Sequence, residues 1–182
     1  AAKLKAAKEK SGFANTGFYV VNGNHDINNS YAVDLTGDKS KPADRVQPSD
    51  FKEVFSGLGY GDDDHWAGGS HSVYVPVSDD PSAVANHGGL SYAADIADGI
   101  TLIVLDTGTY RTDENGESMY NNAQKTAGFV SDDLLAWAAN QAKEAKAKGN
   151  LVLAMSHHGL LPHYDTDLED QAAWYMDSFR VR

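Results

Sequence analysis

Three consecutive polar residues, Asn24, His25 and Asp26, follow an apolar run and a glycine near the start of the sequence. An amide, an imidazole and a carboxylate can together ligate a hard or borderline metal ion, and they can also donate and orient a proton. A second polar pair, His157 and His158, directly follows Ser156 and another apolar run. These two stretches are the candidates for chemistry in this chain.

The elements that position these residues are predicted from three apolar runs, which lie at Phe18–Val21, Ile100–Leu105 and Leu151–Met155. Nearly uninterrupted apolar runs of this length are typical of strands buried on both faces. In open α/β sheets, functional groups collect just beyond the carboxyl ends of the strands. We therefore expect the three runs to share one central sheet, with positions 24–25 and 157 converging at one of its edges.

Helical patterns alternate with the strands, which indicates the α/β class. Helices are predicted at residues 2–10, from Ser49-Asp50 to Leu58, from Ser131 to Gly149, and from Thr166–Glu169 onward. Short additional strands are predicted at Ser72–Val77 and Leu90–Ile96. The helix after Ser131 has a predicted buried stripe of Leu134, Leu135, Ala138, Ala142 and Ala145.

The composition narrows the possible functions. A chain of 182 residues predicts one domain, and its net charge of −11 argues against a protein that grips nucleic acid with lysine and arginine. Without cysteine there is no thiolate metal site, so any metal must be held by His, Asp, Glu or Asn. No apolar run is long enough to span a membrane.

The order of the motifs resembles the calcineurin-like metallophosphoesterases. The strand ending in Gly23–Asp26 is followed by a strand ending in Leu105-Asp106-Thr107, a helix, and a strand ending in Ser156–Gly159. The resemblance covers nearly the whole chain, and its specific parts are Gly23–Asp26 and His157-His158. It implies an α/β sandwich with helices packed outside mixed sheets. The family's upstream Asp-x-His and Gly-Asp blocks and its downstream Gly-His-x-His block are not in the sequence, so residues 1–182 are interpreted as one partial domain.

The resemblance also implies roles for individual residues. Asn24 and His157 would be metal ligands, and His25 would contact the scissile phosphate and act as a general acid. Asp26 would accept a hydrogen bond from His25 and hold its ring, and His158 would line the substrate pocket. The complete domain would use two divalent transition metals, for which Mn, Fe or Zn suit these ligands better than calcium.

The predicted function is metal-dependent hydrolysis of a phosphate monoester, diester or nucleotide, with a small phosphorylated substrate. One alternative is a binding or surface module that keeps the fold without catalysis, and another is a calcium-dependent sugar-binding domain that uses Asp62–Asp64. Because part of the metal site is missing, we expect the 182-residue chain alone to bind at most one transition metal weakly. It would then hydrolyse an aryl phosphodiester barely above background, unless Asp38 or His87 completes the site. The absence of cysteine and the Asn- and Gly-rich loops favour an exported bacterial protein.

Overall fold

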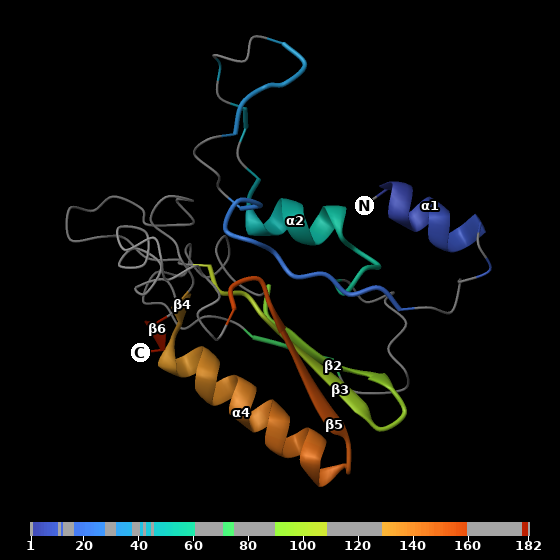
Figure 1. Ribbon diagram of the computed structural model, residues 1–182, viewed down its shortest axis with the longest axis vertical. Coiled ribbons are helices and arrows are strands. Elements are labelled where there is room, and N and C mark those ends of the chain that lie inside the picture. The colour runs from blue at the N-terminus through green and yellow to red at the C-terminus, as the bar shows by residue number, and fades with distance from the viewer. Residues whose placement is uncertain are drawn as a thin grey trace, which may run out of the picture.

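The computed structural model describes residues 2–10, 12, 17–27, 32–37, 41, 43–44, 46–60, 71–74, 90–108, 129–159 and 180–181. Its elements in chain order are α1 (Ala2–Lys10), α2 (Pro48–Val54), β1 (His71–Val73), β2 (Tyr92–Ala97), β3 (Ile100–Leu105), β4 (Phe129–Val130), α4 (Asp132–Ala147), β5 (Leu151–Ser156) and β6 (Arg180–Val181). Figure 1 shows α4 running alongside the sheet and α2 lying beyond the other side of it.

The main sheet has four strands in the order β1-β2-β3-β5. β1 and β2 pair antiparallel, as do β2 and β3, whereas β3 and β5 pair parallel, from Ile100 opposite Leu151 to Leu105 opposite Ser156. A turn at Asp98-Gly99 joins β2 to β3, and Gly99 has a φ of 74°, a backbone conformation that glycine adopts without steric cost. The mixed α/β class is therefore confirmed, as are the predicted strands that became β3 and β5. The prediction that the second of these strands is buried is wrong, because Leu151 and Leu153 of β5 are 61% and 43% exposed.

Helix α4 begins and ends where the sequence predicts. The hydroxyl of Ser131 accepts a hydrogen bond from the backbone N–H of Leu134 at 3.1 Å, and Gly149 follows the helix with a φ of 82°. The helix packs against β3 and β5 through a stripe that includes the buried residues Leu134 and Ala145. The prediction that Leu135 is buried is wrong, because this side chain lies beside the stripe and is 46% exposed.

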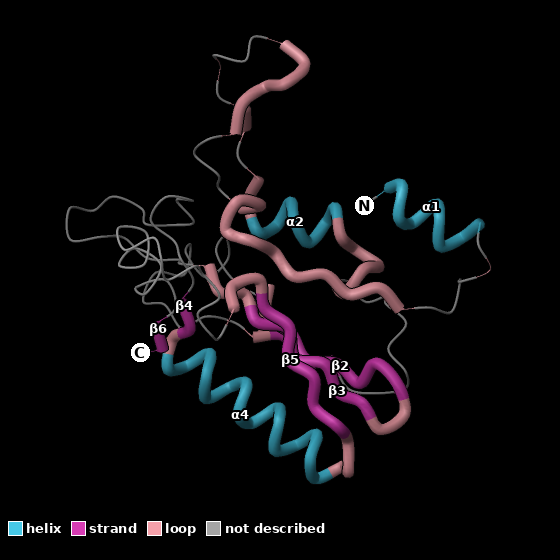
Figure 2. The backbone as a smooth tube through the Cα atoms, in the orientation of Figure 1, coloured by secondary structure: helices cyan, strands magenta, loops and turns pink. Residues whose placement is uncertain are grey.

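The prediction that Phe18–Val21 is a strand is also wrong. This segment is not assigned to any sheet, and Figure 2 draws it as a loop that passes between α2 and the sheet. Its burial comes from packing, since Tyr19, Val20 and Val21 contact the hydrophobic core. The backbone N–H of Val20 donates to the carbonyl of Leu58 at 3.1 Å, so the segment is held to the chain after α2 rather than to a strand ladder.

The core lies between this segment, α2 and one face of the sheet. It contains a set of fully or nearly fully buried side chains: Ile27, Phe51, Tyr60, Leu90, Tyr92, Leu102 and Val104. The two tyrosines satisfy their hydroxyl groups inside the core. Tyr60 donates to the carbonyl of Leu90 at 2.8 Å, and Tyr92 donates to the carbonyl of Val20 at 3.1 Å. The second of these bonds links the sheet to the segment that precedes Gly23.

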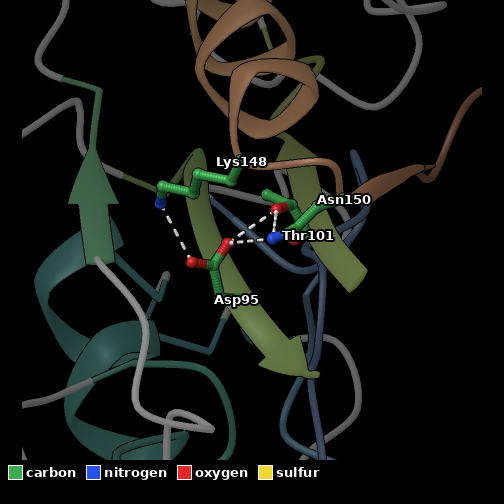
Figure 3. Close-up of polar contacts among 4 residues, drawn as sticks. All are labelled: Asp95, Thr101, Lys148 and Asn150. Carbon is green, nitrogen blue, oxygen red and sulfur yellow. Dashed lines mark hydrogen bonds and ion pairs between the residues drawn. The ribbon is translucent and has the colours of Figure 1, made fainter. Parts of the chain in front are cut away.

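A polar cluster connects α4 to the end of the sheet at which β3 and β5 begin (Figure 3). The Asp95 carboxylate accepts hydrogen bonds from the hydroxyl of Thr101 at 2.6 Å, the ammonium of Lys148 at 2.9 Å and the amide of Asn150 at 3.3 Å. The hydroxyl of Thr101, and then the neighbouring Lys148 and Asn150, hold the pKa of Asp95 below its ordinary value. The cluster joins the starts of β3 and β5 and the end of α4, which is a structural task.

The other predictions have mixed outcomes. The helix at residues 2–10 is confirmed as α1, and the two short predicted strands overlap β1 and β2. The helix predicted from Ser49-Asp50 to Leu58 is α2, which begins at Pro48 and already ends at Val54. The predicted helix after Thr166–Glu169 lies outside the described residues, as do Asp38, Asp62–Asp64 and His87. Across the part of the chain that the structure describes, no helix has the length and apolar character needed to cross a membrane.

Candidate functional site

The site begins where two parallel strands end side by side. Since Leu105 lies opposite Ser156 in the register of β3 and β5, the residues that follow each strand emerge at the same edge of the sheet. Thr107 is fully buried, and its hydroxyl lies 2.6 Å from Nδ1 of His158. This contact fixes the imidazole of His158 to the end of the neighbouring strand.

A tight turn brings a third segment to this edge. The backbone N–H of Asp26 donates to the carbonyl of Gly23 at 3.1 Å, and the carboxylate of Asp26 accepts a hydrogen bond from the N–H of Gly23 at 2.7 Å. These two bonds close residues 23–26 into a compact loop, with Asn24 and His25 at its tip. One carboxylate oxygen of Asp26 is thus engaged by the backbone of the turn, and the His25 side chain is exposed; the expected hydrogen bond from His25 to Asp26 stays a prediction.

Asn24 and His157 meet although they are 133 positions apart in the sequence. The Asn24 side-chain oxygen lies 3.1 Å from Nε2 of His157. Two ligand atoms that each lie about 2.0–2.2 Å from one metal ion, at tetrahedral or octahedral angles, are about 2.8–3.6 Å apart. The observed separation therefore suits either a hydrogen bond, when Nε2 carries a proton, or a shared metal ion, when it does not.

Gly23 makes the close approach of His157 possible. A Cβ atom added at Gly23 would lie 3.0 Å from Cε1 of the His157 ring and 3.1 Å from both ring nitrogens. Any side chain at position 23 would therefore push against the imidazole. The ring of His157 also packs edge-on against that of His158, with ring centroids 4.9 Å apart, so the loop and the two histidines form one contiguous surface.

A buried hydrogen bond lies beneath this surface. The amide nitrogen of Asn22 donates to Oδ1 of Asp106 at 2.7 Å, and the two residues are only 2% and 6% exposed. Oδ1 of Asp106 also accepts from the N–H of Gly108 at 2.9 Å, and the N–H of Asp106 donates to the hydroxyl of Ser91 at 2.8 Å. Burial lowers the pKa of the nearby Lys52 ammonium, and the negative charge of Asp106 partly opposes that effect.

The sequence identified the exposed part of this arrangement and missed the buried part. Of the predicted residues, Asn24 and His157 are in contact, His158 lies beside His157, and His25 and Asp26 belong to the same turn as Asn24. Asn22 was not singled out, and Asp106 was placed at a strand end without a role. The only sequence signal for Asp106 was its position directly after an apolar run.

The number of candidate ligands at this edge is small. Within the described ranges, no three His, Asp or Glu side chains come together in a way that could hold a metal ion. Asn24 and His157 supply one oxygen and one nitrogen donor, which fits part of a transition-metal coordination shell. Asp38 and His87, the other donors considered from the sequence, lie outside the described residues.

Searches against protein-family models and against curated protein sequences found no match to this chain. The resemblance to the metallophosphoesterases accordingly rests on the sequence motifs alone.

Proposed function

We propose that this chain carries part of the active site of a metal-dependent phosphoesterase with a calcineurin-like fold. The observation that supports this proposal most strongly is the 3.1 Å contact between Asn24 and His157. Two motifs on distant parts of the sequence, each suggestive by itself, place their polar atoms at a separation that one metal ion could bridge. The position of Gly23 against the His157 ring adds to this, because the glycine leaves room for the imidazole.

In this function Asn24 and His157 hold a divalent transition metal. When bound, such a metal neutralises charge on the phosphate and lowers the pKa of water, so that hydroxide is supplied near neutral pH. The remaining chemistry belongs to side chains of the turn. His25 is exposed at the tip of the turn, next to Asn24, where its imidazole can reach a phosphate and donate a proton to the leaving oxygen. Asp26 keeps the turn closed through its bond to Gly23.

His158 contributes to the substrate side of the site. Its Nδ1 is engaged by the hydroxyl of Thr107 at 2.6 Å, which limits rotation of the ring. A histidine held in this way presents a fixed edge toward the surface shared with His157, and it can contact a phosphate or its leaving group. The substrate class is a small phosphorylated molecule, and the acidic chain offers little attraction for a nucleic-acid backbone.

The experiment that tests this function measures slow hydrolysis of an aryl phosphodiester and an aryl phosphomonoester by the 182-residue chain, with Mn²⁺ and after removal of metal by a chelator. We expect a low rate that requires Mn²⁺ and that falls to the metal-free level in the His25→Ala variant. The matched control is Asn150→Ala, at the opposite end of the sheet, which should keep the rate of the parent chain. A rate that is indifferent to Mn²⁺, or equal in the His25→Ala variant, would contradict the proposal.

A further inference from the structure

Asn22 has a chemical environment that packing alone does not explain. Its side chain is 2% exposed, and although its nitrogen donates to Asp106, its buried oxygen Oδ1 has no hydrogen-bond partner among the residues that the structure describes. Leaving a buried acceptor without a partner costs about 1–3 kcal/mol, a cost that a leucine of similar size would avoid. A buried polar group kept at such a cost indicates a task that a hydrophobic residue cannot perform.

The hydrogen bond of Asn22 connects the turn to a fixed part of the sheet. Asp106 follows β3 directly, and its own position is determined by the N–H of Gly108 at 2.9 Å and the hydroxyl of Ser91 at 2.8 Å. Asn22 is attached to this anchor at 2.7 Å across 84 positions of sequence. Because Asn22 precedes Asn24 by only two residues, movement at position 22 displaces the Asn24 side chain directly.

The hydrogen bonds inside the turn cannot replace this connection. Both bonds between Gly23 and Asp26 lie within residues 23–26, so they preserve the shape of the turn without fixing its place on the sheet. The Val20–Leu58 backbone bond holds the chain before the turn to the segment after α2. The Tyr92 hydroxyl also holds Val20 to the sheet, but this contact lies further from the turn. The Asn22–Asp106 bond ties the base of the turn to the residue that follows β3.

We propose that Asn22 and Asp106 are a positioning pair that fixes the Asn24 oxygen opposite Nε2 of His157. The pair acts through Asn24 and touches neither metal nor substrate. Its effect on metal affinity depends on the proposed function, whereas its effect on the Asn24–His157 contact does not. Residues that orient a metal ligand typically change metal affinity by about 10- to 100-fold when they are replaced.

The test compares three variants of the 182-residue chain. Asn22→Leu removes the hydrogen bond while keeping the branched shape of the side chain, and the double variant Asn22→Asp with Asp106→Asn restores it with donor and acceptor exchanged. Asn150→Leu is the matched control, because it removes the side-chain bonds of Asn150 to Asp95 and Thr101. That cluster lies roughly 17 Å away along β3, so a general loss of stability is separated from a local effect at the turn.

Two measurements are made on each variant: the NMR resonances of the Asn24 amide and the His157 ring without metal, and the dissociation constant for Co²⁺. In Asn22→Leu we expect both sets of resonances to shift and the Co²⁺ dissociation constant to rise about tenfold. The exchanged double variant should return both toward the parent values, and Asn150→Leu should change neither. If Asn22→Leu does not fold, the Asn24 and His157 resonances of the double variant still test whether the hydrogen bond at position 22 positions Asn24.

Unchanged Asn24 and His157 resonances in a folded Asn22→Leu chain would overturn the proposal. Displaced resonances in a folded double variant would overturn it as well. If the parent chain binds no Co²⁺ but Asn22→Leu still shifts both resonances, the positioning pair is supported and the proposed metal function is the part that fails.

Discussion

Replacing Gly23 by alanine perturbs the site locally, because the three atoms nearest to the added methyl group all belong to His157. The added methyl carbon would lie 3.0–3.1 Å from three atoms of the His157 ring, whereas carbon atoms in ordinary contact are about 3.5–4.0 Å apart. The ring must therefore retreat by a few tenths of an ångström. Since Nε2 of His157 lies 3.1 Å from the Asn24 oxygen, this retreat changes the separation of the two donor atoms.

The expected consequence is a loss of metal affinity with little loss of stability. Alanine reduces the freedom of the unfolded chain, which stabilises the protein by about 0.4–1 kcal/mol, and the exposed His157 ring can move outward at modest cost. We expect the free energy of unfolding to stay within about 1 kcal/mol of the parent value. Metal–ligand distances must hold within about 0.2 Å of their usual values, so the Co²⁺ dissociation constant should rise about tenfold.

The assay is a Co²⁺ titration combined with urea unfolding for Gly23→Ala, His157→Ala and the double variant. If alanine acts only by moving the ring, its effect should vanish once His157 is absent, so the double variant should bind Co²⁺ as His157→Ala does. Additive losses in the double variant, or an unchanged Co²⁺ affinity in folded Gly23→Ala, would refute the reasoning.

Three further outcomes are expected. His25→Ala should reduce turnover and leave metal content unchanged by elemental analysis, because His25 is assigned to the phosphate; loss of metal would mean that the roles are wrongly assigned. Because the pKa of Asp95 is lowered in the folded chain from its ordinary value of 3.8, its charge stabilises the fold above that pH, and this contribution disappears as the pH falls through the lowered pKa. Asp95→Asn should therefore lose about 1 kcal/mol or less at pH 7, and this loss should shrink as the pH is lowered, as measured by urea unfolding; a loss that does not change with pH would contradict this. Gly59→Ala should destabilise the chain by about 1–3 kcal/mol in the same assay, since Gly59 has a φ of 107° and its added Cβ would collide with the Tyr92 hydroxyl; unchanged stability would argue against this packing.

The regular elements could be predicted because their local patterns agree with their tertiary environment. β3 and β5 are apolar runs that pair with each other, and α4 has a serine cap at one end and a glycine at the other. β3 is largely buried, whereas Leu151 and Leu153 of β5 are 61% and 43% exposed. Phe18–Val21 has the same apolar character, and its burial comes instead from contact with the core. An apolar run by itself therefore reports neither whether the segment joins a strand ladder nor how deeply its side chains are buried.

The exposed part of the site could also be predicted, even though one of its supporting elements was wrong. Asn24 and His157 were expected to meet at the ends of two strands, and they meet because the turn at Gly23 follows a packed segment above the sheet. Asn22 could not be identified in the same way. A polar residue at the end of an apolar run is typical of a loop, and only the folded chain shows that its partner is Asp106, 84 positions later.

The central claim is that Asn24 and His157 together hold a transition metal, and Mn²⁺ titration of the isotopically labelled chain tests it most directly. Paramagnetic Mn²⁺ broadens the NMR signals of nuclei close to it, so even a weakly bound ion reveals its position. We predict that the Asn24 amide and His157 ring signals broaden first, that Asp95 and Thr101 signals at the other end of the sheet do not, and that His157→Ala abolishes the effect. Broadening that begins elsewhere in the chain, or that persists at Asn24 in the His157→Ala variant, would contradict the account.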